Sequence, residues 1–134
     1  MIAENSRILA DTSVWIEFFR PGAETGNKLE KLISTNTVWT CGIVLFELTQ
    51  GLKSDEEKKD ILDIFSGIPY VEMNAPLWQK AGELSASLKK KGLNLPFSDI
   101  ILAAIAIEHN LSVFTLDKHF GQIAGVKVCI SVFP

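Results

Sequence analysis

The sequence is poor in cysteine and histidine and has no long hydrophobic run. Its 134 residues include two cysteines and two histidines, and their spacing matches no zinc-binding motif. Cys41 and Cys129 both lie in β-like segments, so we expect buried thiols in a reducing cytoplasm and no disulfide. The longest apolar run, Ile100 to Ile107, is far too short to cross a membrane. With no signal-peptide pattern at the N-terminus, we expect a cytoplasmic protein.

Positive charge is also scarce. The chain has 13 Lys and Arg against 16 Asp and Glu, a net charge of −3 and a pI of about 5.4. Proteins that bind nucleic acids over a broad surface usually carry a basic patch. Any nucleic-acid contact here should therefore depend on a few cationic side chains. The share of hydrophobic residues, 47%, is ordinary for a globular protein, and the length predicts a single domain over residues 1–134.

Strand-like segments alternate with helical segments along the whole chain. We expect strands at 7–10, 37–40, 69–72, 112–115 and 126–132. We expect helices at 14–19, 27–34, 43–52, 54–67, 76–91 and 99–109, and a helical turn at 118–123. Ser98 is expected to be the N-cap of the helix at 99–109. This alternation predicts an α/β fold, a three-layer α/β/α sandwich around a central, mostly parallel sheet.

Four acidic residues border or interrupt hydrophobic runs, where a carboxylate is costly unless something compensates it. They are Asp11, Glu47, Asp99 and Asp117. Asp11 and Asp117 follow predicted strands, and the carboxyl ends of parallel strands meet at one edge of the sheet. Because close carboxylates repel one another, a cluster of them needs a cation, and Mg²⁺ is the usual one. The sequence therefore predicts metal-assisted phosphodiester chemistry.

Each of these acids also has an ordinary structural explanation. Asp11 could cap a helix, and Asp99 could interact favourably with a helix dipole. Asp117 could close a turn after a strand, and Glu47 could reach solvent from an apolar helix. These explanations require four independent coincidences, three of them at the same edge of the sheet. A single cluster explains all four positions at once.

The order of the motifs resembles that of the PIN domain family. The matching segments are Asp11-Thr-Ser13, Phe46-Glu-Leu48 with Gly51, Pro96-Phe-Ser-Asp99 with Ala103 and Ala104, and Thr115-Leu-Asp117 with Phe120. The resemblance covers nearly the whole chain, from about Ile8 onward. Among PIN domains, the short single-domain form is similar to the VapC-type toxins of prokaryotic toxin–antitoxin pairs.

The resemblance implies a Mg²⁺- or Mn²⁺-dependent endoribonuclease that hydrolyses phosphodiester bonds in RNA with a metal-activated water. By position, the four acids would be the catalytic, metal-binding residues, and the hydroxyls of Ser13 and Thr115 would orient them. Many relatives carry a further acid two positions after the last one, where this chain has His119. The number of metal ions, one or two, therefore stays open. Whether His119 replaces a metal ligand also stays open, and we expect it to be a surface or RNA-edge residue rather than a ligand.

The resemblance also implies three partners: an RNA substrate such as tRNA or rRNA, a cognate antitoxin, and a second copy of the chain in a homodimer. Arg20 and Lys118 are candidate RNA contacts, and Lys118 is the better placed because it neighbours Asp117. The aromatic residues at 15–19 and the helix at 61–65 are candidate docking surfaces for the antitoxin. We expect no membrane association.

Two other functions are compatible with the sequence. One is a non-catalytic PIN-like module that only binds a protein partner. The other is an aspartyl-phosphate phosphotransferase with Asp11 as its nucleophile. Enzymes of that kind carry a second Asp two residues on, where this chain has Ser13, and this difference argues against the phosphotransferase.

Overall fold

The fold is built on one parallel five-stranded sheet. The computed structural model describes residues 7–130. The strand order is β3-β2-β1-β4-β5, and every neighbouring pair is parallel. The strands are β1 (Ile8–Ala10), β2 (Val38–Cys41), β3 (Tyr70–Val71), β4 (Ser112–Thr115) and β5 (Lys127–Ile130). All five expected strands form, although the predicted extension of the last one to residue 132 lies outside the described residues.

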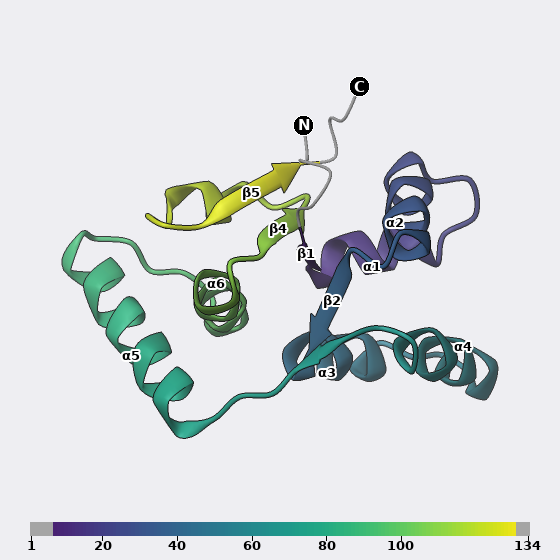
Figure 1. Cartoon of the computed structure of the whole chain (residues 1–134), viewed down its shortest axis with the longest axis horizontal. Coiled ribbons are helices and arrows are strands. Elements are labelled where there is room, and N and C mark those ends of the chain that lie inside the picture. The colour runs from purple at the N-terminus through teal and green to yellow at the C-terminus, as the bar shows by residue number, and fades with distance from the viewer. Residues whose placement is uncertain (1–6, 131–134) are drawn as a thin grey trace.

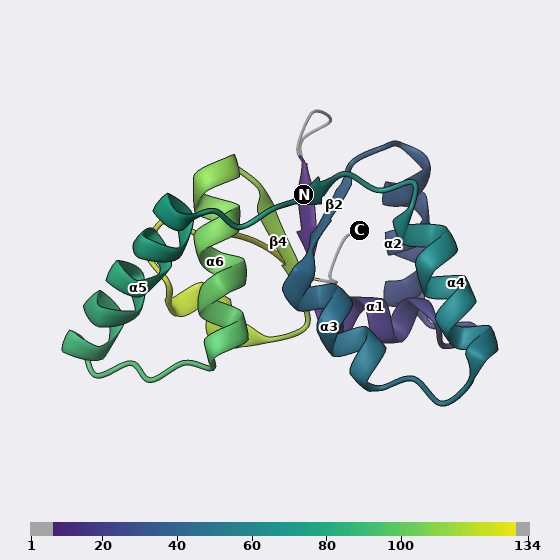
Figure 2. The same ribbon diagram turned by 90° about the horizontal axis from the view of Figure 1, so that it is seen from below.

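Helices cover both faces of the sheet. Figure 1 shows α5 and α6 on one side of the strands and α1 and α2 on the other, and Figure 2 shows the same division from below. The helices are α1 (Thr12–Phe18), α2 (Glu24–Ser34), α3 (Gly42–Gln50), α4 (Asp55–Phe65), α5 (Ala75–Lys90), α6 (Phe97–His109) and the 3₁₀ helix η1 (Lys118–Gln122). The predicted three-layer α/β/α fold is confirmed. None of the helices within residues 7–130 is long and apolar enough to cross a bilayer.

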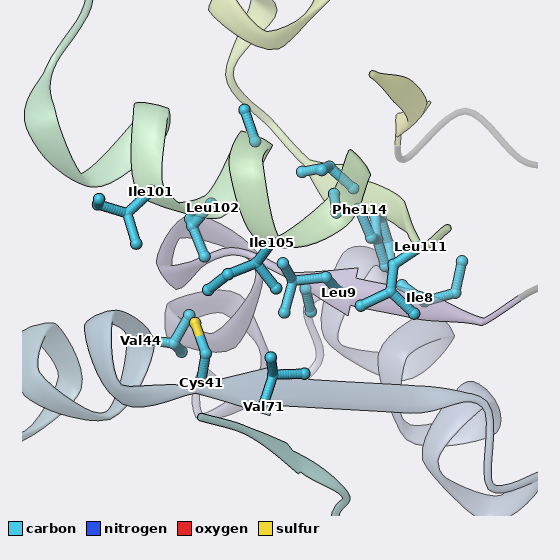
Figure 3. Close-up of a cluster of buried hydrophobic side chains, with 14 of the residues drawn as sticks. Ile8, Leu9, Cys41, Val44, Val71, Ile101, Leu102, Ile105, Leu111 and Phe114 are labelled. Atoms are coloured by element: carbon cyan, nitrogen blue, oxygen red, sulfur yellow. The ribbon is translucent and has the colours of Figure 1, made fainter. Parts of the chain in front are cut away.

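The core lies between α6 and the central strands. Seven consecutive residues of α6, from Ile100 to Ala106, are buried, which explains why this helix is apolar on all sides. Figure 3 shows its side chains meeting those of β1, β2 and β4 in one cluster, with Ile105 near Leu9. Burial on every side holds α6 firmly against the sheet, so its first turn has a fixed position relative to the strand ends.

The central strand β1 ends level with its neighbour β4. Ala10 pairs with Phe114, and the backbone N–H of Asp11 donates to the Phe114 carbonyl at 3.0 Å. Asp11, which follows β1, therefore lies beside Thr115, the last residue of β4, at the carboxyl edge of the sheet. Helix α1 begins directly at that edge.

The predicted N-cap of α6 is wrong. The helix begins at Phe97 with Pro96 as its N-cap, so Ser98 lies inside the first turn. Pro96 has an extended ψ of 147° and no N–H to leave unpaired, and so it suits the position just outside the helix. Asp99 remains in the first turn of α6.

Candidate metal centre

Asp11 is held in place by its own surroundings. Only 6% of the residue is exposed, and its carboxylate caps α1 by accepting from the Val14 backbone N–H at 3.3 Å. The hydroxyls of Ser13 and Thr115 donate to its two oxygens. Burial raises the pKa of Asp11, and these hydrogen bonds oppose that rise. The two hydroxyls that the sequence assigned to orienting the acids both contact this one carboxylate.

Thr115 joins Asp11 to Asp117. Its buried Oγ1 donates to Asp11 and accepts from the backbone N–H of Asp117 at 2.8 Å. The Asp117 carboxylate in turn caps η1 by accepting from the His119 N–H at 2.9 Å. Asp117 therefore has the turn-closing role considered from the sequence, and it also lies beside the other acids. The two explanations are compatible because a carboxylate has several lone pairs.

Glu47 reaches the site from α3. The hydroxyl of Thr12, at the start of α1, donates to Glu47 Oε1 at 2.6 Å. Glu47 is partly buried. The hydrogen bond from Thr12 uses one of its two carboxylate oxygens. The bond also ties α3 to α1 beside Asp11. Sequence reasoning did not find this role for Thr12. Thr12 and Glu47 are 35 positions apart in the sequence and meet only where their two helices approach each other.

Asp99 is the least satisfied acid. Its Oδ2 is buried and has no hydrogen-bond partner among the described residues, and its side chain is 13% exposed. The pKa of Asp99 is raised to about 6, mainly by burial and then by the charges of Asp117, Asp11 and Glu47, while His119 opposes the rise. Asp99 thus lies within electrostatic range of the other three acids, as expected for a single cluster.

His119 also faces the cluster. Its Nδ1 lies 3.1 Å from Asp117 Oδ1 and 3.8 Å from Asp99 Oδ2. One ligand atom from each of these three residues falls within 4.8 Å of the others. The sequence did not predict this proximity, because His119 and Asp99 meet only when η1 packs beside the start of α6.

The arrangement fits a divalent cation. Clustered carboxylates supply the hard oxygen ligands that Mg²⁺ and Mn²⁺ accept. The buried Oδ2 of Asp99 accepts no hydrogen bond from residues 7–130, so its lone pairs can serve a metal ion. A cation beside Asp99 would also reverse the repulsion that raises its pKa. Chemically, such a site can orient a phosphate and activate a water molecule.

The two candidate RNA contacts lie near different acids of this cluster. Arg20 forms an ion pair with Glu17 at 2.9 Å, although its side chain is still 65% exposed, and it lines a groove that includes Glu47. Lys118 is exposed on η1, directly after Asp117. Both can therefore be reached by a substrate that approaches the acids.

Comparison with known proteins gives consistent results. The model of the PIN domain family matches residues 8–126. Ribonuclease VapC2 of Rickettsia felis is 36% identical over 102 residues, which cover 72% of this chain and 76% of that protein. Ribonuclease VapC21 of Mycobacterium tuberculosis is 27% identical over 124 residues, covering 90% of this chain and 88% of that protein.

A solved structure shows the same fold. A chain in the crystal structure of VapBC2 from Rickettsia felis, bound to a DNA fragment from their promoter, superposes with a TM-score of 0.77. Its sequence identity is 29%, and the match covers 92% of this chain and 97% of that one. The likeness therefore extends across the sheet and the helices that carry the four acids.

Proposed function

The chain belongs to the PIN domain family, and on this premise we propose that it is a metal-dependent endoribonuclease of the VapC type. The observation that carries the proposal is the convergence of four acids on one partly buried cluster, in which the charges of the other three raise the pKa of Asp99. The curated relatives are ribonucleases by name. The sheet edge at which the acids meet is where parallel α/β folds place their sites.

The four acids are the proposed metal ligands, and their neighbours set their geometry. Ser13 and Thr115 fix both oxygens of Asp11, and Thr12 fixes one oxygen of Glu47. A bound Mg²⁺ or Mn²⁺ would supply Lewis acidity toward the scissile phosphate and a water of lowered pKa. The protein itself needs no nucleophilic side chain. Its acids would hold the ion that orients the phosphate. Helix α6, which is packed against the sheet, keeps Asp99 beside the ends of the strands.

The direct test is cleavage of tRNA and rRNA pools by the purified protein, with Mg²⁺, with Mn²⁺ and with a chelator. We expect cleavage only with a divalent ion, and we expect Asp99→Asn and Asp11→Asn to abolish it. Asp63→Asn is the matched control, because Asp63 is an exposed acid on α4. Full activity in the Asp99 variant would remove that residue from the mechanism.

An antitoxin is the proposed protein partner. A groove beside Glu47 has an apolar floor that includes Ile16 and Phe19, which are 51% and 37% exposed, and it carries Arg20 and Asp60 among its charged residues. An amphipathic helix fits such a surface. A partner seated there would reach the edge of the metal centre at Glu47, which belongs to both. The groove lies where the antitoxin surfaces were expected, between 15–19 and 61–65.

Partner binding is tested with the product of any small gene that lies beside the gene for this chain. The two chains are co-expressed and purified together, and RNA cleavage is measured with and without the partner. We expect co-purification and inhibition, both weakened by Ile16→Glu, which places a charge on the apolar floor. Sedimentation of the chain alone tests the proposed homodimer.

The alternative of a non-catalytic binding module has a simple discriminating measurement. Titration of Mg²⁺ or Mn²⁺ by calorimetry should give a binding heat that disappears in Asp99→Asn. A pure scaffold gives no metal-dependent heat in either protein. The phosphotransferase alternative loses its support, because the chain belongs to a different family.

A further inference from the structure

We infer that the His119 imidazole is a nitrogen ligand of the metal and makes the site prefer a transition-metal ion over Mg²⁺. The inference rests on the proposed function and deepens it. It differs from the sequence expectation, which placed His119 at the surface or at the RNA edge.

The distances around His119 suit a shared ion. Nδ1 lies 3.1 Å from Asp117 Oδ1 and 3.8 Å from Asp99 Oδ2. Adjacent ligands of an octahedral ion, each about 2.1 Å from it, lie about 3 Å apart, and opposite ligands lie about 4.2 Å apart. The separation of 3.1 Å matches adjacent ligands, and the separation of 3.8 Å lies between the two values. One of the two oxygens, Asp99 Oδ2, is the buried atom that has no hydrogen-bond partner among residues 7–130.

The backbone holds His119 in this position. Its N–H donates to Asp117 Oδ1 at 2.9 Å, so the residue is part of the capped first turn of η1. The next residue, Phe120, is fully buried and anchors the same turn in the core. The side chain of His119 is still 50% exposed, which leaves room for an ion and its waters. A ring placed this way needs little reorganisation to bind a metal.

The nitrogen donor has a consequence for metal choice. Mg²⁺ prefers oxygen ligands and keeps much of its water, whereas first-row transition ions accept imidazole more readily. The ratio of Mn²⁺ affinity to Mg²⁺ affinity should therefore be higher at a site that mixes carboxylates with one imidazole than at an all-carboxylate site. The competing explanation is that His119 only offsets the negative charge of the acids and leaves when an ion binds.

Pulsed electron paramagnetic resonance of the Mn²⁺-loaded protein separates these explanations without any activity measurement. The protein is prepared without an affinity tag. The chain has two histidines, so His109, at the far end of α6, is the matched control. We expect ¹⁴N modulation from a directly bound imidazole in the wild type and in His109→Ala, and its loss in His119→Ala. Labelling histidine with ¹⁵N should change the modulation accordingly.

Calorimetric titrations give the second readout. We expect His119→Ala to weaken Mn²⁺ binding about tenfold and Mg²⁺ binding less than about threefold. His119→Asp restores an oxygen ligand and should shift the preference back toward Mg²⁺. Tight Mn²⁺ binding without nitrogen modulation in the wild type would overturn the inference and leave the nuclease proposal standing. Absence of any Mn²⁺ binding would overturn both.

Discussion

Asp11 and Asp99 both stand at the start of a helix beside the same edge of the sheet, yet their surroundings are opposite. Asp11 receives hydrogen bonds from two hydroxyls and a backbone N–H. Asp99 has a buried oxygen with no hydrogen-bond donor in the described part of the chain, and three acids around it. The protein stabilises one carboxylate with its own donors and leaves the other for a cation. The hydrogen bonds to Asp11 offset part of the cost of burying its charge, whereas the charges of the neighbouring acids add to that cost at Asp99.

The largest effect should come from Asp99→Asn in metal-free protein. The Asp99 carboxyl has its ordinary pKa of 3.8 when unfolded and about 6 when folded, so the folded state binds more protons between these values. Wild-type stability should therefore fall, relative to the variant, as pH rises from about 4 to about 6, and then level off. We expect the variant to be more stable at about pH 8, by up to about 3 kcal/mol.

The measurement is urea unfolding at a series of pH values in the presence of a chelator. Asp63→Asn, on the exposed face of α4, should not share the gain. If Asp99→Asn proved less stable than the wild type above pH 6, the repulsion described around Asp99 would be wrong.

Bound metal should stabilise the folded wild type, whereas the repulsion around Asp99 destabilises it. An ion that binds only the folded state at about one hundred times its Kd adds about 2.7 kcal/mol of stability. We expect Mn²⁺ to raise the Tm of the wild type, a chelator to reverse the rise, and Asp99→Asn to lose most of it. An equal rise in both proteins would mean that the ion binds elsewhere.

Thr115→Val should remove part of the hydrogen bonding that holds Asp11. The variant keeps the shape of the side chain but removes the hydroxyl that donates to Asp11 and accepts from the Asp117 N–H. Leaving buried polar groups unpaired costs about 1–3 kcal/mol, so we expect a loss of stability of that size by urea unfolding. Thr115→Ser, which keeps the hydroxyl, is the control and should recover most of it.

Thr12→Val should have the smallest effect. It removes the hydrogen bond to Glu47 Oε1 and frees a carboxylate that the fold otherwise orients. Loss of such an orienting group typically lowers metal affinity about tenfold. Calorimetry with Mn²⁺ should detect this, with Thr12→Ser close to the wild type. Unchanged affinity in Thr12→Val would exclude Thr12 from positioning Glu47.

Local sequence was enough to locate the sheet and the residues at its edge. Asp11 and Asp117 follow strands whose apolar composition is plain, and parallel strands place their carboxyl ends together. The start of α6 was predicted wrongly because Ser98 resembles an N-cap and Pro96 fills that position instead. Leu62 of α4 is 48% exposed although it is apolar, whereas its neighbour Ile61 is buried, so α4 packs through only some of its apolar residues.

The contacts of Thr12 and His119 could not be predicted in the same way. Thr12 meets Glu47 only where α3 approaches α1, and His119 meets Asp99 only where η1 packs beside α6. A threonine after an Asp is ordinary, and the position of His119, where many relatives carry an acid, does not by itself show what its ring contacts. Their roles depend on tertiary distances that no spacing in the sequence encodes.

The position of β1 between β2 and β4 has a consequence for synthesis of the chain. Asp11 emerges early from the ribosome, but its partner strand β4 begins only at Ser112. No growing chain shorter than about Asp117 can therefore assemble the cluster, whatever helices have already formed. The order of the strands keeps the nascent protein without a working centre until translation has nearly passed through the whole fold.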